Sequence, residues 1–231
     1  MNNNILLKNF LEKMQLDKNE ITILEIGGND GYQNDLIYPY AIKTNFVTHI
    51  LEPIPVYYEQ LKILYENYKN VHTYNYAITK KTEVDYINYI PPADNMPVWL
   101  KGCSSFFSDK NVINGMQTRN LDDSIAPFVN ETVMKYIKNN IQKLPVNCLS
   151  FKDFIELSKI SNIDILVVDT EGYELEILKQ IDLNKFSISL IILEYHNHYC
   201  IDKLSMESLL RKFNYSIAFT DHNFDIIGYK Y

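Results

Sequence analysis

The chain has 231 residues, 46% of them hydrophobic and 22% charged, and its formal net charge is -7. That length fits one α/β domain with a sizeable core and argues against a second full domain. Its lysines and arginines are scattered rather than clustered, which disfavours a nucleic-acid partner. No run reaches the roughly 18 apolar residues that span a bilayer, and the polar-punctuated N-terminus does not resemble a signal peptide. We therefore expect a cytoplasmic protein without a membrane span.

The three cysteines, Cys103, Cys148 and Cys200, lie far apart and form no CxxC pair. This spacing indicates reduced thiols rather than a structural zinc site or a disulfide framework. We therefore expect the chemistry to rest on other side chains.

The first part of the chain alternates helical and extended patterns. Apolar residues at i, i+3, i+4 and i+7 predict an amphipathic helix over about residues 3–17. Short β-branched runs predict strands at 21–27 and 46–53. A helical pattern follows the second run, and Pro55 suits its first turn.

The middle of the chain changes character. Residues 71–79 predict a third strand, and residues 82–90 predict a further extended segment. Over about residues 91–123, prolines and glycines then interrupt any spacing of apolar residues that would predict a helix or a strand. Such a long irregular excursion is usually functional, so we expect it to lie on the substrate side.

Helices and strands alternate again through the rest of the chain. The predicted elements are a helix over about 129–142, a short strand at 146–150, a helix from Phe151, a strand at 164–169, a helix from Tyr173, a strand at 189–196 and a helix over about 204–213. Two extended runs then flank a tight turn at 221–223, which predicts an antiparallel hairpin. The alternation predicts a doubly wound, mostly parallel α/β sheet with helices on both faces, to which the hairpin adds an antiparallel strand.

The first candidate site is the acidic glycine-rich turn EIGGNDG at 25–31. Ligands of open α/β sheets bind at the carboxyl ends of strands, and glycines there let the backbone approach a ligand closely. Neither Gly27 nor Gly28 begins the G-x-G-x-x-G spacing of a dinucleotide site. Asp30 also puts negative charge where a pyrophosphate needs backbone donors. The turn therefore favours a cationic or zwitterionic ligand, and the alternative is a simple tight turn.

Glu52 ends the second predicted strand, about 20 residues beyond the glycine turn. An acidic side chain in this place can accept hydrogen bonds from both hydroxyls of an adenosine ribose. This feature alone does not separate NAD from S-adenosylmethionine. A solvated strand end is the alternative interpretation.

A second acidic strand end follows the apolar run DILVV, where Asp169 and Glu171 stand beside the same expected crevice. Here the sequence resembles the FkbM-type methyltransferases. The resemblance rests on ordered segments that cover most of residues 21–198, namely LEIGGNDG, HILEPIPVYYEQL, NYAIT, GCSSF, DILVVDTEGYELEILKQ and LIILEYH. The chain departs from the family at Glu25 and Gly28, where Asp and Ala are more frequent, and at VNCLSFKDF, which replaces a Thr-Leu-Asp-containing stretch.

The resemblance implies an S-adenosylmethionine-dependent enzyme that O-methylates sugars or related hydroxyl-bearing metabolites. It implies one class I, Rossmann-like domain over residues 1–231, with a seven-stranded sheet that ends in the antiparallel hairpin. The cofactor-binding residues implied by the matched positions are Glu25, Gly27, Gly28, Asn29, Gly31, Glu52, Asn75, Ala77 and Asp169.

Methyl transfer to a hydroxyl needs a base for the acceptor proton. We favour His196 over Asp169, because a neutral imidazole titrates near the working pH and an exposed carboxylate is a weaker proton acceptor. Glu194 lies two residues before His196 and shares its strand face, so it could orient the imidazole. Alternatively, both could join Asp169 and Glu171 around a divalent cation, or His196 and His198 could be ordinary polar residues.

Ser104 and Ser105 lie in the irregular excursion and could offer hydroxyl donors to the acceptor. The other predicted substrate-binding residues are Glu171, Glu194 and His196. The leading hypothesis is an O-methyltransferase that acts on a sugar or nucleotide-linked sugar, where the sugar rests on the resemblance alone. An N-methyltransferase, an NAD-dependent oxidoreductase and a catalytically silent cofactor-binding scaffold stay open. A homo-oligomer is compatible with the sequence.

Overall fold

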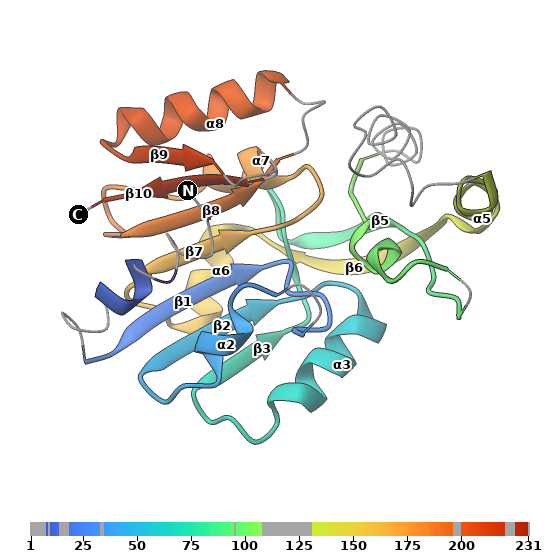
Figure 1. Ribbon diagram of the computed structural model, residues 1–231, viewed down its shortest axis with the longest axis horizontal. Helices are drawn as coiled ribbons and strands as arrows, with labels where there is room; N and C mark the ends of the chain where they lie inside the picture. The colour runs from blue at the N-terminus through green and yellow to red at the C-terminus, as the bar shows by residue number, and fades with distance from the viewer. Residues whose placement is uncertain are drawn as a thin grey trace.

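A computed structural model describes residues 8, 10–13, 19–32, 35–94, 96–107, 131–195, 200–219 and 225–230. Within them a seven-stranded sheet has the order β3-β2-β1-β7-β8-β10-β9 (Figure 1). Its strands are β1 (Ile21–Ile26), β2 (Phe46–Leu51), β3 (Val71–Tyr74), β7 (Ile165–Val168), β8 (Leu190–Glu194), β9 (Ser216–Phe219) and β10 (Asp225–Tyr229). The first five strands of this order are parallel, whereas β10 is antiparallel to both of its neighbours. The doubly wound sheet and the terminal hairpin are therefore confirmed.

Both faces of the sheet are buried, because the central strands are apolar on each side. In β1, Leu24 and Ile26 belong to one core cluster, whereas Ile21 and Ile23 belong to the other. This alternation follows from the two-residue period of a strand. One face is covered by α6 (Phe151–Ser158), α7 (Glu174–Leu178) and α8 (Cys200–Lys212), and the other by α2 (Tyr38–Ala41), α3 (Pro55–Tyr65) and the helical residues 10–13.

The helix predicted over about 3–17 falls largely outside the described residues. Residues 8 and 10–13 are helical, and within them Phe10 and Leu11 are buried against the second face of the sheet. None of the helices in the described part of the chain combines the length and the apolar character that crossing a bilayer requires.

The prediction of a single third strand over residues 71–79 is wrong. The run divides into β3, which pairs with β2, and β4 (Ala77–Ile78), which pairs with β6 (Gln142–Leu149) in a second sheet. Asn75 marks the division, because its side-chain amide donates to the backbone oxygens of Glu52 and Pro53 at 2.9 and 3.1 Å. These bonds hold the chain at the end of β2 and direct it away from the edge of the large sheet.

The second sheet has the order β4-β6-β5 and contains the predicted extended segment as β5 (Glu83–Tyr89). It extends beyond the carboxyl ends of the parallel strands, with α5 (Glu131–Asn140) at its far end (Figure 1). The short strand predicted at 146–150 is thus the end of a longer one that begins at Gln142.

The described part of the irregular excursion forms a strap over residues 96–107. It contains the 3-10 helix η1 (Val98–Gly102) and joins the second sheet, since Asn88 and Ser105 exchange two backbone hydrogen bonds of 2.8 and 3.0 Å. Leu100 and Cys103 pack with residues of α5 in a small apolar cluster. The excursion from 108 to 123 lies outside the described residues.

The central position of β7 gives a stability test. Leu166 on β7 is fully buried, so Leu166→Ala should lower the free energy of unfolding by about 2–5 kcal/mol in urea titrations. Leu157→Ala is the matched control, because Leu157 is 52% exposed on α6 and its truncation should change stability by no more than about 0.5 kcal/mol. Equal losses in the two variants would contradict this placement of β7.

Candidate active site

A cavity of about 460 Å³ opens at the carboxyl ends of β1, β2, β7 and β8, where ligands of open α/β sheets bind. The second sheet and the strap complete its walls. The predicted site residues that line it are Glu25, Gly27, Gly28, Asn29, Glu52, Ala77, Ser104, Asp169, Glu171 and Glu194. Gly31, Asn75 and Ser105 stand behind this lining, and His196 lies outside the described residues.

The glycine turn is held against both neighbouring strands. Gly27 has φ +98°, and a Cβ atom there would lie 1.7 Å from the backbone oxygen of Asp169. Only glycine tolerates both this positive φ and so close an approach of a neighbouring backbone atom. The backbone amides of Gly27 and Gly28 donate to the oxygen of Leu51 at 2.9 and 3.0 Å. The turn is therefore fixed between the ends of β2 and β7.

Glu52 is buried, with 5% of its surface exposed, so the interpretation as a solvated strand end is wrong. Its two carboxylate oxygens accept from the amides of Asn29, at 2.9 Å, and Ile54, at 2.7 Å. Burial is the largest effect on its pKa and raises it to about 7, although both amides oppose this shift. Glu52 thus ties the glycine turn to the end of β2 and faces the cavity.

Glu174 is a residue to which the sequence analysis gave no role. Its Oε1 atom accepts from the amides of Thr170 and Gly172, at 2.8 and 3.1 Å, and from the Thr170 hydroxyl at 3.0 Å. The turn it fixes is conformationally unusual, because Glu171 has φ +54° and Gly172 has φ +111°. An acidic residue in the first turn of a helix is a common local signal, but its bonds to the preceding turn become visible only in the fold.

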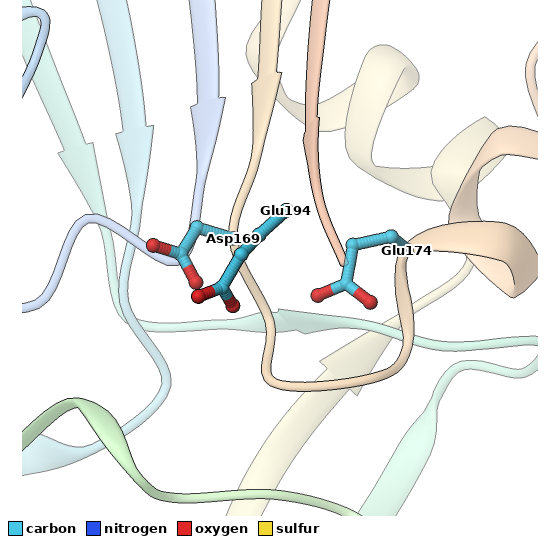
Figure 2. Close-up of side chains that lie close together, drawn as sticks. All are labelled: Asp169, Glu174 and Glu194. Atoms are coloured by element: carbon cyan, nitrogen blue, oxygen red, sulfur yellow. The ribbon is translucent and has the colours of Figure 1, made fainter. Parts of the chain in front are cut away.

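Asp169 and Glu194 form a hydrogen-bonded carboxyl pair at the ends of β7 and β8 (Figure 2). Two carboxyl groups hydrogen-bond to each other only when one carries a proton. Asp169 is an exposed residue of the cavity lining, and desolvation by the surrounding protein and then the charges of Glu171, Glu174 and Asp225 raise its pKa to about 7. Burial and then Asp169 raise the pKa of Glu194 well above its ordinary value.

The carboxylate of Glu174 points towards this pair (Figure 2). One oxygen from each of Asp169, Glu174 and Glu194 lies within 4.8 Å of the others, which makes the three a candidate cation site among the described residues. The residues predicted from the sequence for such a site were Asp169, Glu171, Glu194 and His196. Glu174 is the member that this prediction did not include.

The strap is attached to both acidic turns. Lys101 forms an ion pair of 3.1 Å with Asp30 in the glycine turn. On the other side the Ser105 hydroxyl donates to the backbone oxygen of Glu171 at 2.8 Å. The neighbouring Ser104 is 9% exposed, and its hydroxyl lines the cavity without a hydrogen-bond partner. Ser105 therefore has a structural bond, whereas Ser104 offers a polar group to a ligand.

Asp35 is a cavity residue that sequence reasoning missed. It precedes the short helix α2, and its Oδ1 accepts from the amides of Ile37 and Tyr38, at 2.6 and 3.1 Å. Such a pattern in a sequence indicates only the start of a helix or turn. No sequence signal shows that the residue lines the cavity or that its other oxygen is buried without a hydrogen-bond partner.

Comparisons with known proteins identify what this arrangement is similar to. A family model described as the methyltransferase FkbM domain matches residues 25–217. No curated protein sequence matches the chain.

Among solved structures, the methyltransferase FkbM from Methylobacillus flagellatus aligns with a TM-score of 0.54 and 10% identity, over 92% of this chain and 44% of that one. The chain thus spans less than half of that protein, and the likeness shows a shared fold. A precorrin-6y C5,15-methyltransferase from Geobacter metallireducens aligns at 0.43 and 12% identity, over 92% and 82% of the two chains. Fibrillarin from Aeropyrum pernix with bound S-adenosyl-L-methionine aligns at 0.44 and 10%, over 92% and 66%.

The crowded carboxyl groups predict how stability depends on pH. Groups whose pKa is raised keep protons in the folded protein that the unfolded chain has released, so the free energy of unfolding should fall as pH rises from about 5 to 8. Each extra bound proton contributes a slope of about 1.4 kcal/mol per pH unit. Asp169→Asn should flatten the dependence in urea titrations at stepped pH.

The control variant is Asp182→Asn. Asp182 is exposed and lies outside the cavity lining, so its replacement should leave the parent slope unchanged. Stability that stays constant or rises over this window would contradict the burial of protonated carboxyl groups.

Proposed function

Because the chain belongs to the FkbM methyltransferase family, with S-adenosylmethionine as its methyl donor, we propose that it methylates a hydroxyl group of a small acceptor, a sugar or nucleotide-linked sugar. The observation that carries the proposal is the Asp169–Glu194 carboxyl pair, which provides a proton acceptor in the cavity beside the glycine turn. Family membership decides against the oxidoreductase alternative. The proposal concerns which group is methylated, a hydroxyl, and which class of acceptor carries it, a sugar.

The residues present fit the cofactor. Two buried oxygens, Oε2 of Glu25 and Oδ1 of Asn29, have no hydrogen-bond partner, although both residues line the cavity. A ligand with several donors would satisfy them. We place the methionine part against Gly27, Gly28 and Asn29, the ribose at Glu52 and the adenine near Ala77. When bound, the cofactor supplies a methyl group on a positively charged sulfonium.

Asp169 is the base we propose, with Glu194 as the group that positions it. A base works best when its pKa lies near the working pH, and that of Asp169 is about 7. From the sequence, His196 ranked first because an exposed carboxylate is a weak base. Asp169 is exposed, but its raised pKa makes it a stronger proton acceptor than an ordinary carboxylate. With the cofactor bound as methyl donor, Asp169 would accept the proton that the acceptor hydroxyl loses on methylation.

Two neighbours complete the acceptor side. The Ser104 hydroxyl is free to hydrogen-bond an acceptor oxygen, and Glu171 lines the cavity where it can accept from a second hydroxyl. Such polar groups position the reacting oxygen, which is the main task of the protein in a displacement at an activated carbon.

Proton sharing competes with a metal at the same carboxylates. A divalent cation needs ionised oxygen ligands, whereas burial favours the protonated forms of Asp169 and Glu194. Oε1 of Glu174 already accepts three hydrogen bonds. We therefore propose a reaction without a metal, and the divalent cation stays an alternative for the experiment to decide.

The test is a screen of hydroxyl and amine acceptors with methyl-labelled S-adenosylmethionine, run with and without a chelator. Asp169→Asn should lower kcat on the accepted substrate by roughly 10²- to 10⁴-fold, because it removes the base. Binding of S-adenosylhomocysteine should persist. The parent kcat should rise with pH through an inflection near 7, as Asp169 ionises.

His196→Ala and Asp182→Asn are the comparison variants. A larger loss of kcat in His196→Ala than in Asp169→Asn would overturn the choice of base, and loss of activity with the chelator would establish the metal alternative. Transfer to amines alone would replace O-methylation by N-methylation. Cofactor binding without transfer to any acceptor would favour the silent scaffold.

A further inference from the structure

The strap over residues 96–107 forms one wall of the cavity between the two acidic turns. Lys101 contacts the glycine turn that follows β1, and Ser105 contacts the turn that follows β7. A ligand in the cavity therefore lies between the strand ends of the main sheet and the strap. The strap residues that line the cavity are Lys101, Gly102, Ser104 and Phe106.

The end of the strap at Ser105 is anchored through the backbone. Ser105 exchanges two backbone hydrogen bonds with Asn88, and its carbonyl oxygen also accepts from the Asn88 side-chain amide at 3.1 Å. Its hydroxyl donates to the backbone oxygen of Glu171 at 2.8 Å. The ring of Phe107 packs against Gly172, where a Cβ atom would lie 2.5 Å from it. Opening this end would break several of these contacts at once.

The end of the strap at Lys101 is held by a contact of a different kind. The Lys101 Nζ atom lies 3.1 Å from Oδ2 of Asp30, and the two side chains are 26% and 11% exposed. The neighbouring Leu100 and Cys103 pack in the small cluster with α5 rather than in either core cluster of the main sheet. A partly exposed ion pair is weakened by salt, and it can open without breaking backbone hydrogen bonds. The two ends of the strap thus differ in how readily they open.

We propose that Lys101 is the latch of the strap: its ion pair with Asp30 holds the strap against the glycine turn, and the cofactor and its product pass when this pair opens. Closing the latch also places Ser104, whose buried hydroxyl lines the cavity without a hydrogen-bond partner. Lys101 is therefore a positioning residue rather than a catalytic one. This inference rests on the proposed placement of the cofactor in the cavity and holds whichever acceptor is methylated.

The experiment measures the association and dissociation rates of S-adenosylhomocysteine on the immobilised protein by surface plasmon resonance. In Lys101→Gln both rates should rise roughly 3- to 10-fold, between the effects expected for exposed ion pairs and for buried charged hydrogen bonds. The dissociation constant should stay within about threefold of the parent value, because a latch changes both rates together. A residue that only contacts the ligand would change the dissociation rate alone.

Asp30→Asn tests whether the two charges act as a pair. It keeps an Oδ1 atom, which in the parent accepts from the Tyr32 amide at 3.1 Å. Its rates should rise as those of Lys101→Gln do, and the double variant should exceed neither single variant by more than about twofold. Raising NaCl from about 50 to about 500 mM should speed release from the parent several-fold and change release from the double variant by less than about twofold.

Lys179→Gln is the matched control, because Lys179 forms an ion pair of 2.7 Å with Glu176 outside the cavity lining. It should leave both rates unchanged. The proposal would be overturned if Lys101→Gln released the ligand at the parent rate, lost binding or changed the dissociation rate alone. It would also be overturned if the effects of the two single variants multiplied in the double variant. Failure to find a methyl acceptor would leave these rates unaffected, so it would count against the proposed function alone.

Discussion

The site depends on one electrostatic constraint, the crowding of carboxylates at the carboxyl ends of parallel strands. Glu25 lies near the end of β1 and Glu194 ends β8, whereas Glu52 and Asp169 directly follow β2 and β7. All four line one cavity. Parallel strands bring their carboxyl ends to the same edge, so residues distant in sequence converge there. Each carboxyl then loses water and faces the others, which raises its pKa.

The fold accommodates these groups in three different ways, and the difference separates structural from functional carboxylates. Glu52 and Glu174 accept from backbone amides and so hold the turns of the site in place. Asp169 and Glu194 hydrogen-bond to each other, while desolvation and the surrounding carboxylates raise the pKa of Asp169 to about 7. Glu25 and Asp35 each keep one buried carboxylate oxygen without a hydrogen-bond partner. A buried polar group without a hydrogen-bond partner lowers the stability of the ligand-free protein. A cationic ligand that pairs with such a group recovers this free energy on binding.

Local pattern was enough to predict the sheet, the hairpin and several of the residues that line the cavity, because each strand end carries its own signal. The division between β3 and β4 was missed, since it depends on Asn75 bonding to Glu52 and Pro53 across the chain. Asp35 was missed because its visible pattern is that of a helix start. The raised pKa of Asp169 was missed for a similar reason, because the acidic groups that surround it are brought there by the fold rather than by the segment.

The proposed cofactor and acceptor ends of the cavity meet at Asp169. Its amide donates to the oxygen of Ile26 at 3.0 Å, and its own backbone oxygen packs on Gly27, where no side chain would fit. The side chain of the same residue is hydrogen-bonded to Glu194. A ligand that orders the glycine turn therefore also orders the backbone that carries the proposed base. The Ser105 hydroxyl donates to the backbone oxygen of Glu171, two residues after Asp169, so the strap is attached to the same turn. The geometry needed for in-line transfer is thus set by one turn rather than by two independent halves.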